Sequence, residues 1–327
     1  MKLIVQIPCL NEADTLPETL AEIPRHIEGV DVVEVLVMDD GSTDGSAELA
    51  SQHGADHVVR STRSRGLAAT FKVGIDTALR LGADLIVNTD GDNQYPGSAI
   101  PRLVGPILRG EADMVIGDRR VATVEHFSFT KKKLQALGSW VVRQVSGTDV
   151  PDTTSGFRAL THEAAQRLNL VSDYTYTLET IIQAGKKRLS ITHVRIEARQ
   201  TRPSRLIRSN WDYVKRSAAT IVRIYAMYEP LKFFSYVGGA FVVPGVALSL
   251  RYLYFREILG EGQGHIQSVV LAGVLLILGF MIFLIGLVAD INASTRRLLE
   301  EALYRQRKLE DRLDAEAAER EKQEAHR

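Results

Sequence analysis

Residues 88–96 read Asn88-Thr89-Asp90-Gly91-Asp92-Asn93-Gln94-Tyr95-Pro96 and directly follow the apolar run Leu85-Ile86-Val87. An apolar run ending in two aspartates is typical of a buried strand whose carboxylates emerge at its end, where a parallel α/β sheet binds ligands. Gly91 permits a tight turn, so Asp90, Asp92 and Gln94 can converge on one hard divalent cation, which would hold a diphosphate. A polar turn is the alternative, because Asp, Gly, Asn and Pro all favour turns.

The composition narrows the class of protein. The chain has 327 residues, and its 40 Lys and Arg balance its 40 Asp and Glu, so net charge gives no argument for nucleic-acid binding. The single cysteine, Cys9, excludes an intrachain disulfide and fits a reducing compartment. With no histidine nearby, we interpret Cys9 as a packing residue. The apolar run at residues 3–7 is too short for a signal peptide, so we expect a cytosolic N-terminal region.

The first 120 residues alternate short apolar runs with helical patterns. This rhythm predicts βαβ units around a mostly parallel sheet, as in a Rossmann-like α/β domain. The expected strands are residues 3–7, 32–38, 57–59, 85–88 and 114–117, and the expected helices are residues 13–26, 46–53, 67–81 and 100–109.

Residues 121–204 have a looser pattern. Helical spacing predicts helices at residues 129–145 and 175–183, separated by a polar loop at residues 152–157. Residues 193–197 alternate in polarity, as an exposed or edge strand does. We expect this half to complete one domain over residues 1–204 and to form its acceptor side.

Residues 205–232 are basic and amphipathic. An apolar stripe recurs at steps of four and three residues in Ile207, Trp211, Val214, Ala218, Ile221 and Tyr225, with arginines and lysines beside it. Such a helix fits the plane of a membrane interface. Packing on a soluble core would be the other interpretation if no membrane segment followed.

Residues 233–290 are predicted to form a transmembrane hairpin. Spans at 233–255 and 266–289 are nearly free of charge, and even the apolar runs 233–250 and 266–289 reach about 27 and 36 Å, against a hydrocarbon core of about 30 Å. Basic residues flank both outer ends of the hairpin, which predicts that both termini are cytosolic. The tail, residues 291–327, is charged and expected to be helical, with a thin leucine seam that could support a homo-oligomer.

Three further polar stretches accompany residues 88–96. They are Pro8-Cys9-Leu10-Asn11-Glu12, Asp39-Asp40-Gly41-Ser42-Thr43-Asp44 and Arg65-Gly66-Leu67. Each follows an expected strand or starts an expected helix, so in a parallel sheet all four stretches share one edge. Each alone could be a turn or a helix cap, but a common ligand explains the four together.

As a set, these stretches resemble the family 2 glycosyltransferases, inverting enzymes of GT-A fold that use nucleotide-sugar donors. The resemblance covers about residues 1–205. It implies that the nucleotide sugar contacts Pro8, Leu10, Asn11, Glu12, Asp39, Asp40, Gly66 and Asp90. It also implies that Asp90 and Asp92 hold Mg²⁺ or Mn²⁺ on the diphosphate, with Gln94 as a further ligand in the branch similar to dolichol-phosphate-mannose synthase. A divalent cation would stabilise the charge that develops on the leaving diphosphate.

The acceptor side resembles polyprenyl-phosphate glycosyltransferases. Asp152-Thr153-Thr154-Ser155-Gly156-Phe157-Arg158 is similar to their Asp-x-x-Ser-Gly-Phe-Arg element, and Gly117-Asp118-Arg119 to their Gly-Ser-Arg element. The resemblance implies that Arg119, Arg158, Arg202 and Arg205 receive a lipid phosphate, and that Asp152 and Arg119 are catalytic. Asp152 orients the site if the acceptor is a phosphate and acts as the base if it is a hydroxyl. Arg199-Gln200-Thr201-Arg202-Pro203-Ser204-Arg205 departs from the family's Arg-x-x-Gly-x-Ser-Lys element, which weakens the acceptor assignment more than the donor assignment.

The resulting hypothesis is a metal-dependent, membrane-anchored hexosyltransferase that moves mannose or glucose from a GDP- or UDP-sugar to polyprenyl phosphate on the cytosolic leaflet. A glycan or lipid-linked oligosaccharide is the alternative acceptor. A non-catalytic membrane platform that binds a nucleotide sugar is the alternative from another class of protein.

Overall fold

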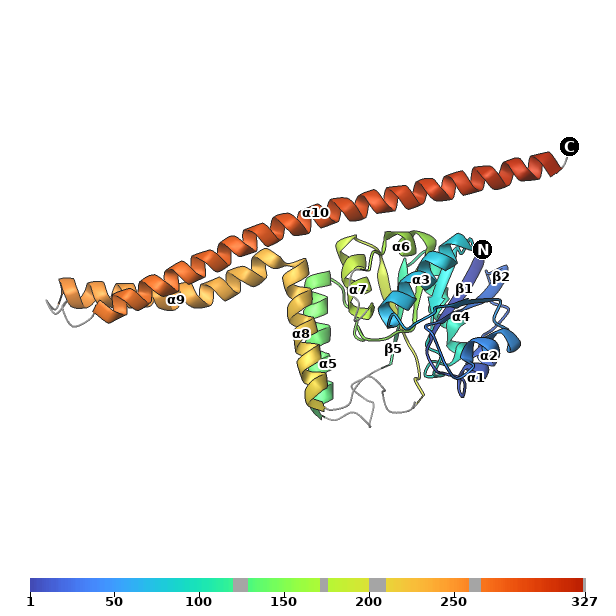
Figure 1. Ribbon diagram of the computed structural model, residues 1–327, viewed down its shortest axis with the longest axis horizontal. Coiled ribbons are helices and arrows are strands. Elements are labelled where there is room, and N and C mark those ends of the chain that lie inside the picture. The colour runs from blue at the N-terminus through green and yellow to red at the C-terminus, as the bar shows by residue number, and fades with distance from the viewer. Residues whose placement is uncertain (120–128, 171–175, 200–209, 259–265, 326–327) are drawn as a thin grey trace. The chain divides into compact units, whose positions relative to one another are not determined.

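The computed structural model describes residues 1–119, 129–170, 176–199, 210–258 and 266–325 (Figure 1). The chain forms two compact units. The first comprises Met1–Ser217 together with Leu303–Arg327, and the second comprises Ala218–Ala302. Residues 205–209, the predicted start of the interfacial segment, and the predicted acceptor residues Arg202 and Arg205 lie outside the described residues.

A 7-stranded sheet forms the centre of the first unit, in the order β3-β2-β1-β4-β6-β5-β7. Its strands are β1 (Lys2–Cys9), β2 (Val32–Asp39), β3 (His57–Arg60), β4 (Leu85–Asn88), β5 (Met114–Asp118), β6 (Arg158–Thr161) and β7 (Ile191–Arg195). All pairings are parallel except those of β6, which runs antiparallel to β4 and β5. The predicted α/β fold with a mostly parallel sheet is therefore confirmed.

Helices cover the sheet and fill the connections between strands (Figure 1). The first unit contains α1 (Leu16–Glu22), α2 (Ser46–Gln52), α3 (Leu67–Arg80), the short 3₁₀ helix η1 (Gly97–Ala99), α4 (Ile100–Leu108), α5 (Phe129–Ser146), α6 (His162–Arg167) and α7 (Thr177–Lys186). Leu3, Val5 and Ile7 of β1 are fully buried in the largest apolar cluster. Ile4 between them is equally buried, so β1 has protein on both faces, as a central parallel strand requires.

Several elements differ from the expectation. β6 begins directly after the predicted polar loop at residues 152–157 and was not predicted, because only four residues form it and the first is an arginine. Its strand character comes from pairing with β4 and β5, which lie far away in the sequence. α1 spans Leu16–Glu22 and not residues 13–26, because Pro24 prevents the helix from continuing.

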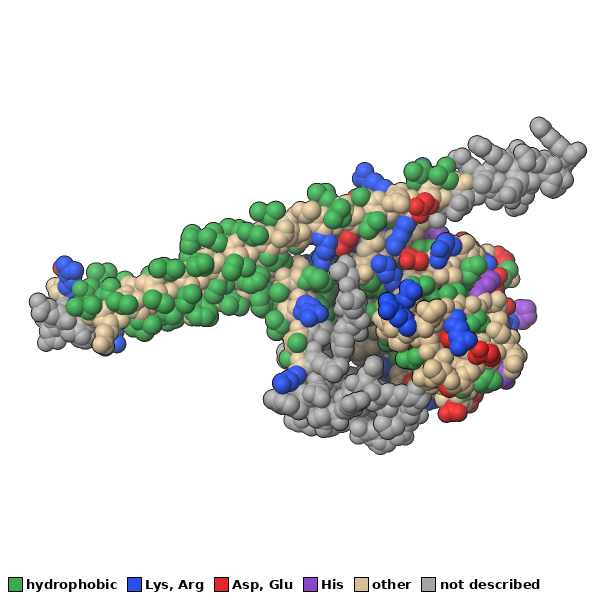
Figure 2. All heavy atoms as spheres, viewed as in Figure 1, with side chains coloured by type: hydrophobic (Ala, Val, Ile, Leu, Met, Phe, Trp, Pro, Cys, Tyr) green, Lys and Arg blue, Asp and Glu red, His purple; other side chains and the backbone are tan. Residues whose placement is uncertain are grey.

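The helices beyond residue 209 are α8 (Asn210–Tyr228), α9 (Pro230–Glu257) and α10 (Ile266–Ala325). Two of them, α9 and α10, are long and apolar enough to cross a membrane, and most residues in their apolar stretches are not buried. Figure 2 shows hydrophobic side chains along the apolar parts of both helices. Glycines let them pack closely, because a Cβ on Gly238 would lie 2.9 Å from the carbonyl oxygen of Gly279. Length, apolarity and close packing are those of a transmembrane hairpin.

The last part of α10 belongs to the first unit and contacts it through polar side chains. Arg307 Nη1 donates to the carbonyl oxygens of Gln166 (2.7 Å) and Leu168 (3.1 Å), at the end of α6. Its Nη2 forms an ion pair with Asp76 of α3 at 3.2 Å. The sequence pattern predicted only a thin leucine seam for this tail, whereas in the structure the tail contacts α3 and the end of α6 through Arg307.

Candidate active site

The ends of three neighbouring strands meet at one edge of the sheet. Cys9, the last residue of β1, pairs with Asp39, the last residue of β2. Asn88, the last residue of β4, pairs with Gln6 of β1. The stretches that follow these strands therefore leave from the same edge, as the sequence predicted for a shared ligand.

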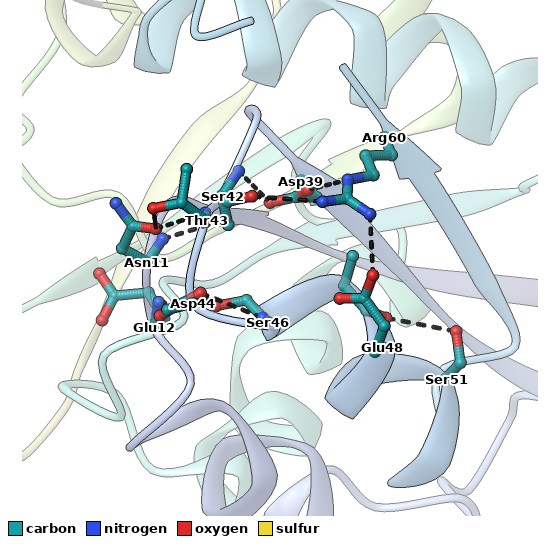
Figure 3. Close-up of polar contacts among 11 residues, drawn as sticks. Asn11, Glu12, Asp39, Ser42, Thr43, Asp44, Ser46, Glu48, Ser51 and Arg60 are labelled. Carbon is teal, nitrogen blue, oxygen red and sulfur yellow. Dashed lines mark hydrogen bonds and ion pairs between the residues drawn. The ribbon is translucent and has the colours of Figure 1, made fainter. Parts of the chain in front are cut away.

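Hydrogen bonds join the stretches after β1 and β2 into one polar surface (Figure 3). The backbone N–H groups of Asn11 and Glu12 donate to the hydroxyls of Ser42 and Ser46, both at 2.9 Å. In return, the Thr43 N–H donates to Asn11 Oδ1 at 2.9 Å. Asn11 has φ +56°, a conformation that asparagine tolerates better than most residues. The predicted nucleotide-binding residue Asn11 thus shapes the loops that would receive the ligand.

The two adjacent aspartates, Asp39 and Asp40, are used differently. Asp40 accepts hydrogen bonds at both carboxylate oxygens, from Ser64 Oγ, the Arg65 N–H and the Gly66 N–H. It therefore holds the loop in which Gly66 adopts φ +91°.

Asp39 is buried and accepts from the Ser42 N–H at 3.0 Å through Oδ1. Its Oδ2 has no hydrogen-bond partner, although Arg60 Nε lies 3.4 Å away in an ion pair (Figure 3). A buried carboxylate oxygen without a hydrogen bond is costly, so Asp39 is the aspartate of this pair that is prepared to accept one from a ligand.

Asp90 and Asp92 follow β4, and the charge of Asp92 acts on the Asp90 carboxyl. Burial, together with the negative charge of Asp92, raises the pKa of Asp90 from 3.8 to about 7. Glu12 also lies beside this turn, because a Cβ on Gly91 would come within 3.5 Å of its Cγ. Thr15, at the start of α1, donates to the Gly91 carbonyl at 2.8 Å and fixes the turn.

The donor set at this turn fits a hard divalent cation. Repulsion that raises the pKa of Asp90 is relieved when a cation binds two carboxylates. Within the described part of the chain, no group of three or more His, Cys, Asp and Glu side chains is arranged to hold a metal ion. Two carboxylates completed by phosphate oxygens of a substrate are nevertheless a usual environment of Mg²⁺.

Gln94, the predicted third ligand, contacts two parts of the site. Its backbone N–H donates to Asp92 Oδ1 at 3.1 Å. Its side-chain Oε1 accepts from Arg119 Nη1 at 3.2 Å. The assignment of Gln94 as a metal ligand stays a prediction.

Arg119, one residue beyond β5, forms a fork with Asp152. Arg119 Nε lies 2.7 Å from Asp152 Oδ2, and Nη2 lies 3.1 Å from Oδ1 and 2.8 Å from Thr154 Oγ1. Burial alone would raise the pKa of Asp152, but the charge and hydrogen bonds of Arg119 outweigh it and lower that pKa. Asp152 is therefore a weak base whose carboxylate orients the Arg119 guanidinium.

Arg158 occupies a different environment from the one predicted. Its side chain is fully buried, lies over the Tyr176 ring and donates to the carbonyl oxygens of Thr177 and Ser155 and to Thr180 Oγ1. These internal acceptors bind Nη1 and Nη2, whereas Nε has no hydrogen-bond partner among the described residues. Arg158 therefore braces β6 against α7 in this structure, and its assignment to the acceptor phosphate stays a prediction.

Several positioning residues escaped the sequence analysis. Asn88 Nδ2 donates to the Gly156 carbonyl at 2.8 Å and to Tyr176 Oη at 3.2 Å, and the Gly156 N–H donates to Tyr95 Oη at 3.2 Å. A Cβ on Gly156 would lie 3.0 Å from both carboxylate oxygens of Asp90, so only glycine fits there comfortably. A polar residue at the end of the apolar strand β4 was the available signal for Asn88.

Comparisons with known proteins agree with this geometry. The fold is GT-A-like: a solved structure of glucosyl-3-phosphoglycerate synthase from Mycobacterium tuberculosis, in complex with Mn²⁺, UDP-glucose and phosphoglyceric acid, matches with a TM-score of 0.55. The match is 24% identical and covers 69% of this chain and 79% of that chain. The family model described as glycosyl transferase family 2 matches residues 4–168, so the chain belongs to this family and is a glycosyltransferase.

One relative extends the similarity beyond residues 4–168, the part that the family model matches. A protein named glycosyltransferase AglJ, from Haloferax volcanii, is 28% identical over 89% of this chain and 93% of its own length. The undecaprenyl-phosphate mannosyltransferase of Micrococcus luteus is 31% identical over 52% of this chain and 70% of its own length.

Proposed function

We propose that the protein transfers a hexose, of the mannose or glucose type, from a GDP- or UDP-sugar to a polyprenyl phosphate at a membrane. The observation that carries this proposal is the Arg119–Asp152 fork beside the Asp90 and Asp92 turn, which joins a cationic group to a metal-type donor set. The undecaprenyl-phosphate mannosyltransferase relative supports the acceptor class. The apolar helices α9 and α10 support membrane anchoring, and we expect the catalytic domain and both termini on the cytosolic side.

In the proposed reaction, an oxygen of the acceptor phosphate attacks the anomeric carbon of the sugar as the bond to the nucleoside diphosphate breaks. Attack from the opposite face inverts the configuration at that carbon. Asp90 and Asp92 would hold Mg²⁺ or Mn²⁺, which when bound neutralises charge on the departing diphosphate. Asp39 would accept a hydrogen bond from the nucleotide through the carboxylate oxygen that lacks one in the protein.

Arg119 would bind and orient the acceptor phosphate. Asp152 and Thr154 hold its Nε and Nη2, and Gln94 Oε1 accepts from Nη1, so the second N–H of Nη1 would donate to a phosphate oxygen. A phosphate acceptor is already ionised, so the reaction needs no strong base. This requirement agrees with the lowered pKa of Asp152 and disfavours a hydroxyl acceptor, for which Asp152 would have to remove a proton.

An acceptor competition tests the proposal. The full-length protein in detergent is incubated with Mn²⁺, a panel of UDP- and GDP-hexoses, and an equimolar mixture of polyprenyl phosphate and a neutral oligosaccharide. We expect a lipid-linked monosaccharide from at least one donor. Glycosylation of the oligosaccharide alone would show that the acceptor is wrong, and binding of a nucleotide sugar without any transfer would favour the non-catalytic platform.

A further inference from the structure

Arg199, a residue far away in the sequence, forms hydrogen bonds with the turn that carries Asp92. The Arg199 N–H donates to the Gln94 carbonyl at 2.9 Å, and Nη1 donates to Asn93 Oδ1 at 2.8 Å. The same Nη1 lies 2.8 Å from Glu22 Oε1, at the end of α1. Arg199 therefore contacts the turn through both its backbone and its side chain.

Glu22 holds the other end of the same segment. Its second carboxylate oxygen, Oε2, accepts from the Gly97 N–H at 3.4 Å. Gly97 packs directly on the end of α1, since a Cβ at this position would lie 2.3 Å from the Glu22 carbonyl oxygen. Residues 93–97 are thus fixed at one end by Arg199 and at the other by Glu22, and these two side chains bind each other.

The conformation of the turn shows why it needs such support. Asn93 is buried and has φ +56°, in the left-handed region that costs energy for residues other than glycine. The Gln94 N–H in turn bonds to Asp92 Oδ1, so the position of Gln94 bears directly on the direction of the Asp92 carboxylate. Displacing Asn93 and Gln94 would therefore disturb Asp92 before it disturbed the core of the domain.

The electrostatics of the contact favour local positioning over global stabilisation. A hydrogen bond to Arg199 lowers the pKa of Glu22, and the same bond raises the pKa of Arg199. The two side chains are 28% and 44% exposed, so solvent screens their attraction and little folding stability depends on it. The hydrogen bonds from Arg199 to Asn93 and Gln94 fix the geometry of the turn more specifically than the ion pair with Glu22 does.

We propose that Arg199 is a positioning residue for the metal-binding turn, which holds Asn93 and Gln94 so that Asp92 converges with Asp90 on the divalent cation. This inference rests on the proposed function. Arg199 also immediately precedes residues 200–209, the segment that joins the catalytic domain to α8.

Manganese binding tests the proposal without relying on turnover. Free Mn²⁺ is measured by electron paramagnetic resonance during titration of the detergent-solubilised full-length protein, in the presence of UDP or GDP. Arg195→Ala is the matched control, because Arg195 is an exposed arginine on the neighbouring strand β7 and its backbone carbonyl, which the substitution keeps, accepts from Arg102. Arg199→Lys keeps the charge but replaces the guanidinium, whose Nη1 contacts both Asn93 and Glu22, by an ammonium group of different reach and geometry.

We expect Arg199→Ala to weaken Mn²⁺ binding about tenfold, the effect of losing about 1.4 kcal/mol. Arg199→Lys should give an intermediate loss, and Arg195→Ala should stay within about twofold of the wild type. The melting temperature of Arg199→Ala without metal should match that of the control, which separates positioning from a general loss of structure. Equal Mn²⁺ affinities of Arg199→Ala and Arg195→Ala overturn this inference alone. Absence of Mn²⁺ binding by the wild type overturns both the inference and the metal site of the proposed function.

Discussion

Replacing Asp90 by asparagine should stabilise the metal-free protein while abolishing sugar transfer. The folded protein holds the Asp90 proton up to about pH 7, whereas the unfolded chain releases it near pH 3.8. As the pH rises between these values, Asp90 ionises in the unfolded chain but not in the folded protein, so the folding stability falls. Asparagine has a similar shape and no charge, so the variant avoids this cost above pH 7.

The size of the effect follows from the pKa. A difference of about three pH units corresponds to about 4 kcal/mol at about 1.4 kcal/mol per unit. Asp90 keeps some contact with solvent, which screens its charge, so we expect a gain of about 2–4 kcal/mol at pH 8.5. For a catalytic domain of this size, that gain raises the melting temperature by about 4–16 °C.

Thermal unfolding in EDTA measures the effect at pH 8.5 and pH 5.5. At pH 5.5 the unfolded chain has already released the Asp90 proton while the folded protein keeps it, so the gain of Asp90→Asn over the wild type should fall to about half of its value at pH 8.5. Asp14→Asn, at an exposed aspartate, is the control and should change neither value. A variant that melts at the same temperature as the wild type at both pH values would refute the reasoning, because Asp90 would then carry no electrostatic cost.

Three other substitutions test separate parts of the structure. Gly156→Ala should lower kcat at least tenfold, because its Cβ would lie 2.9 Å from Tyr176 Oη and 3.0 Å from the Asp90 oxygens; steady-state kinetics with an unchanged far-UV circular dichroism spectrum checks this. Asp152→Asn should reduce kcat without removing a limb from the pH–rate profile between pH 6 and 9, since the pKa of Asp152 is lowered; loss of a limb would identify it as the base. Arg307→Ala should destabilise the first unit by about 1–2 kcal/mol, because it removes the bonds to two carbonyls and to Asp76. Thermal unfolding measures this against Arg312→Ala, and equal melting temperatures of the two variants would contradict the prediction.

The donor side of the site was predictable because its signals are local. Each of its stretches combines an apolar strand with the polar residues that directly follow it, and strand order then places them on one edge. The structure adds that Asp39 and Asp40 have different roles, which the sequence pattern does not reveal. Asp40 supports a loop through three hydrogen bonds, whereas Asp39 keeps one oxygen without a hydrogen bond.

The acceptor side was less predictable because it depends on contacts between distant residues. Arg158 has the residue type of a phosphate ligand, yet its place in β6, paired with Asn88 of β4, turns it into the interior. Arg199 and Glu22 are 177 positions apart, and nothing near either residue indicates their contact. The tail was assigned from its charge pattern, and its contact through Arg307 depends on where α6 ends.

Formation of the lipid-linked sugar is the most direct test of the proposed function. The full-length protein and its Asp92→Asn variant are incubated with Mn²⁺, a UDP- or GDP-hexose and polyprenyl phosphate, and the lipid extract is analysed by mass spectrometry. We predict a polyprenyl-phosphate hexose whose anomeric configuration is inverted relative to the donor. The variant should form it at least a hundredfold more slowly, as expected for loss of about 3 kcal/mol of transition-state stabilisation. An equal rate for both proteins, or a product with retained configuration, would contradict it.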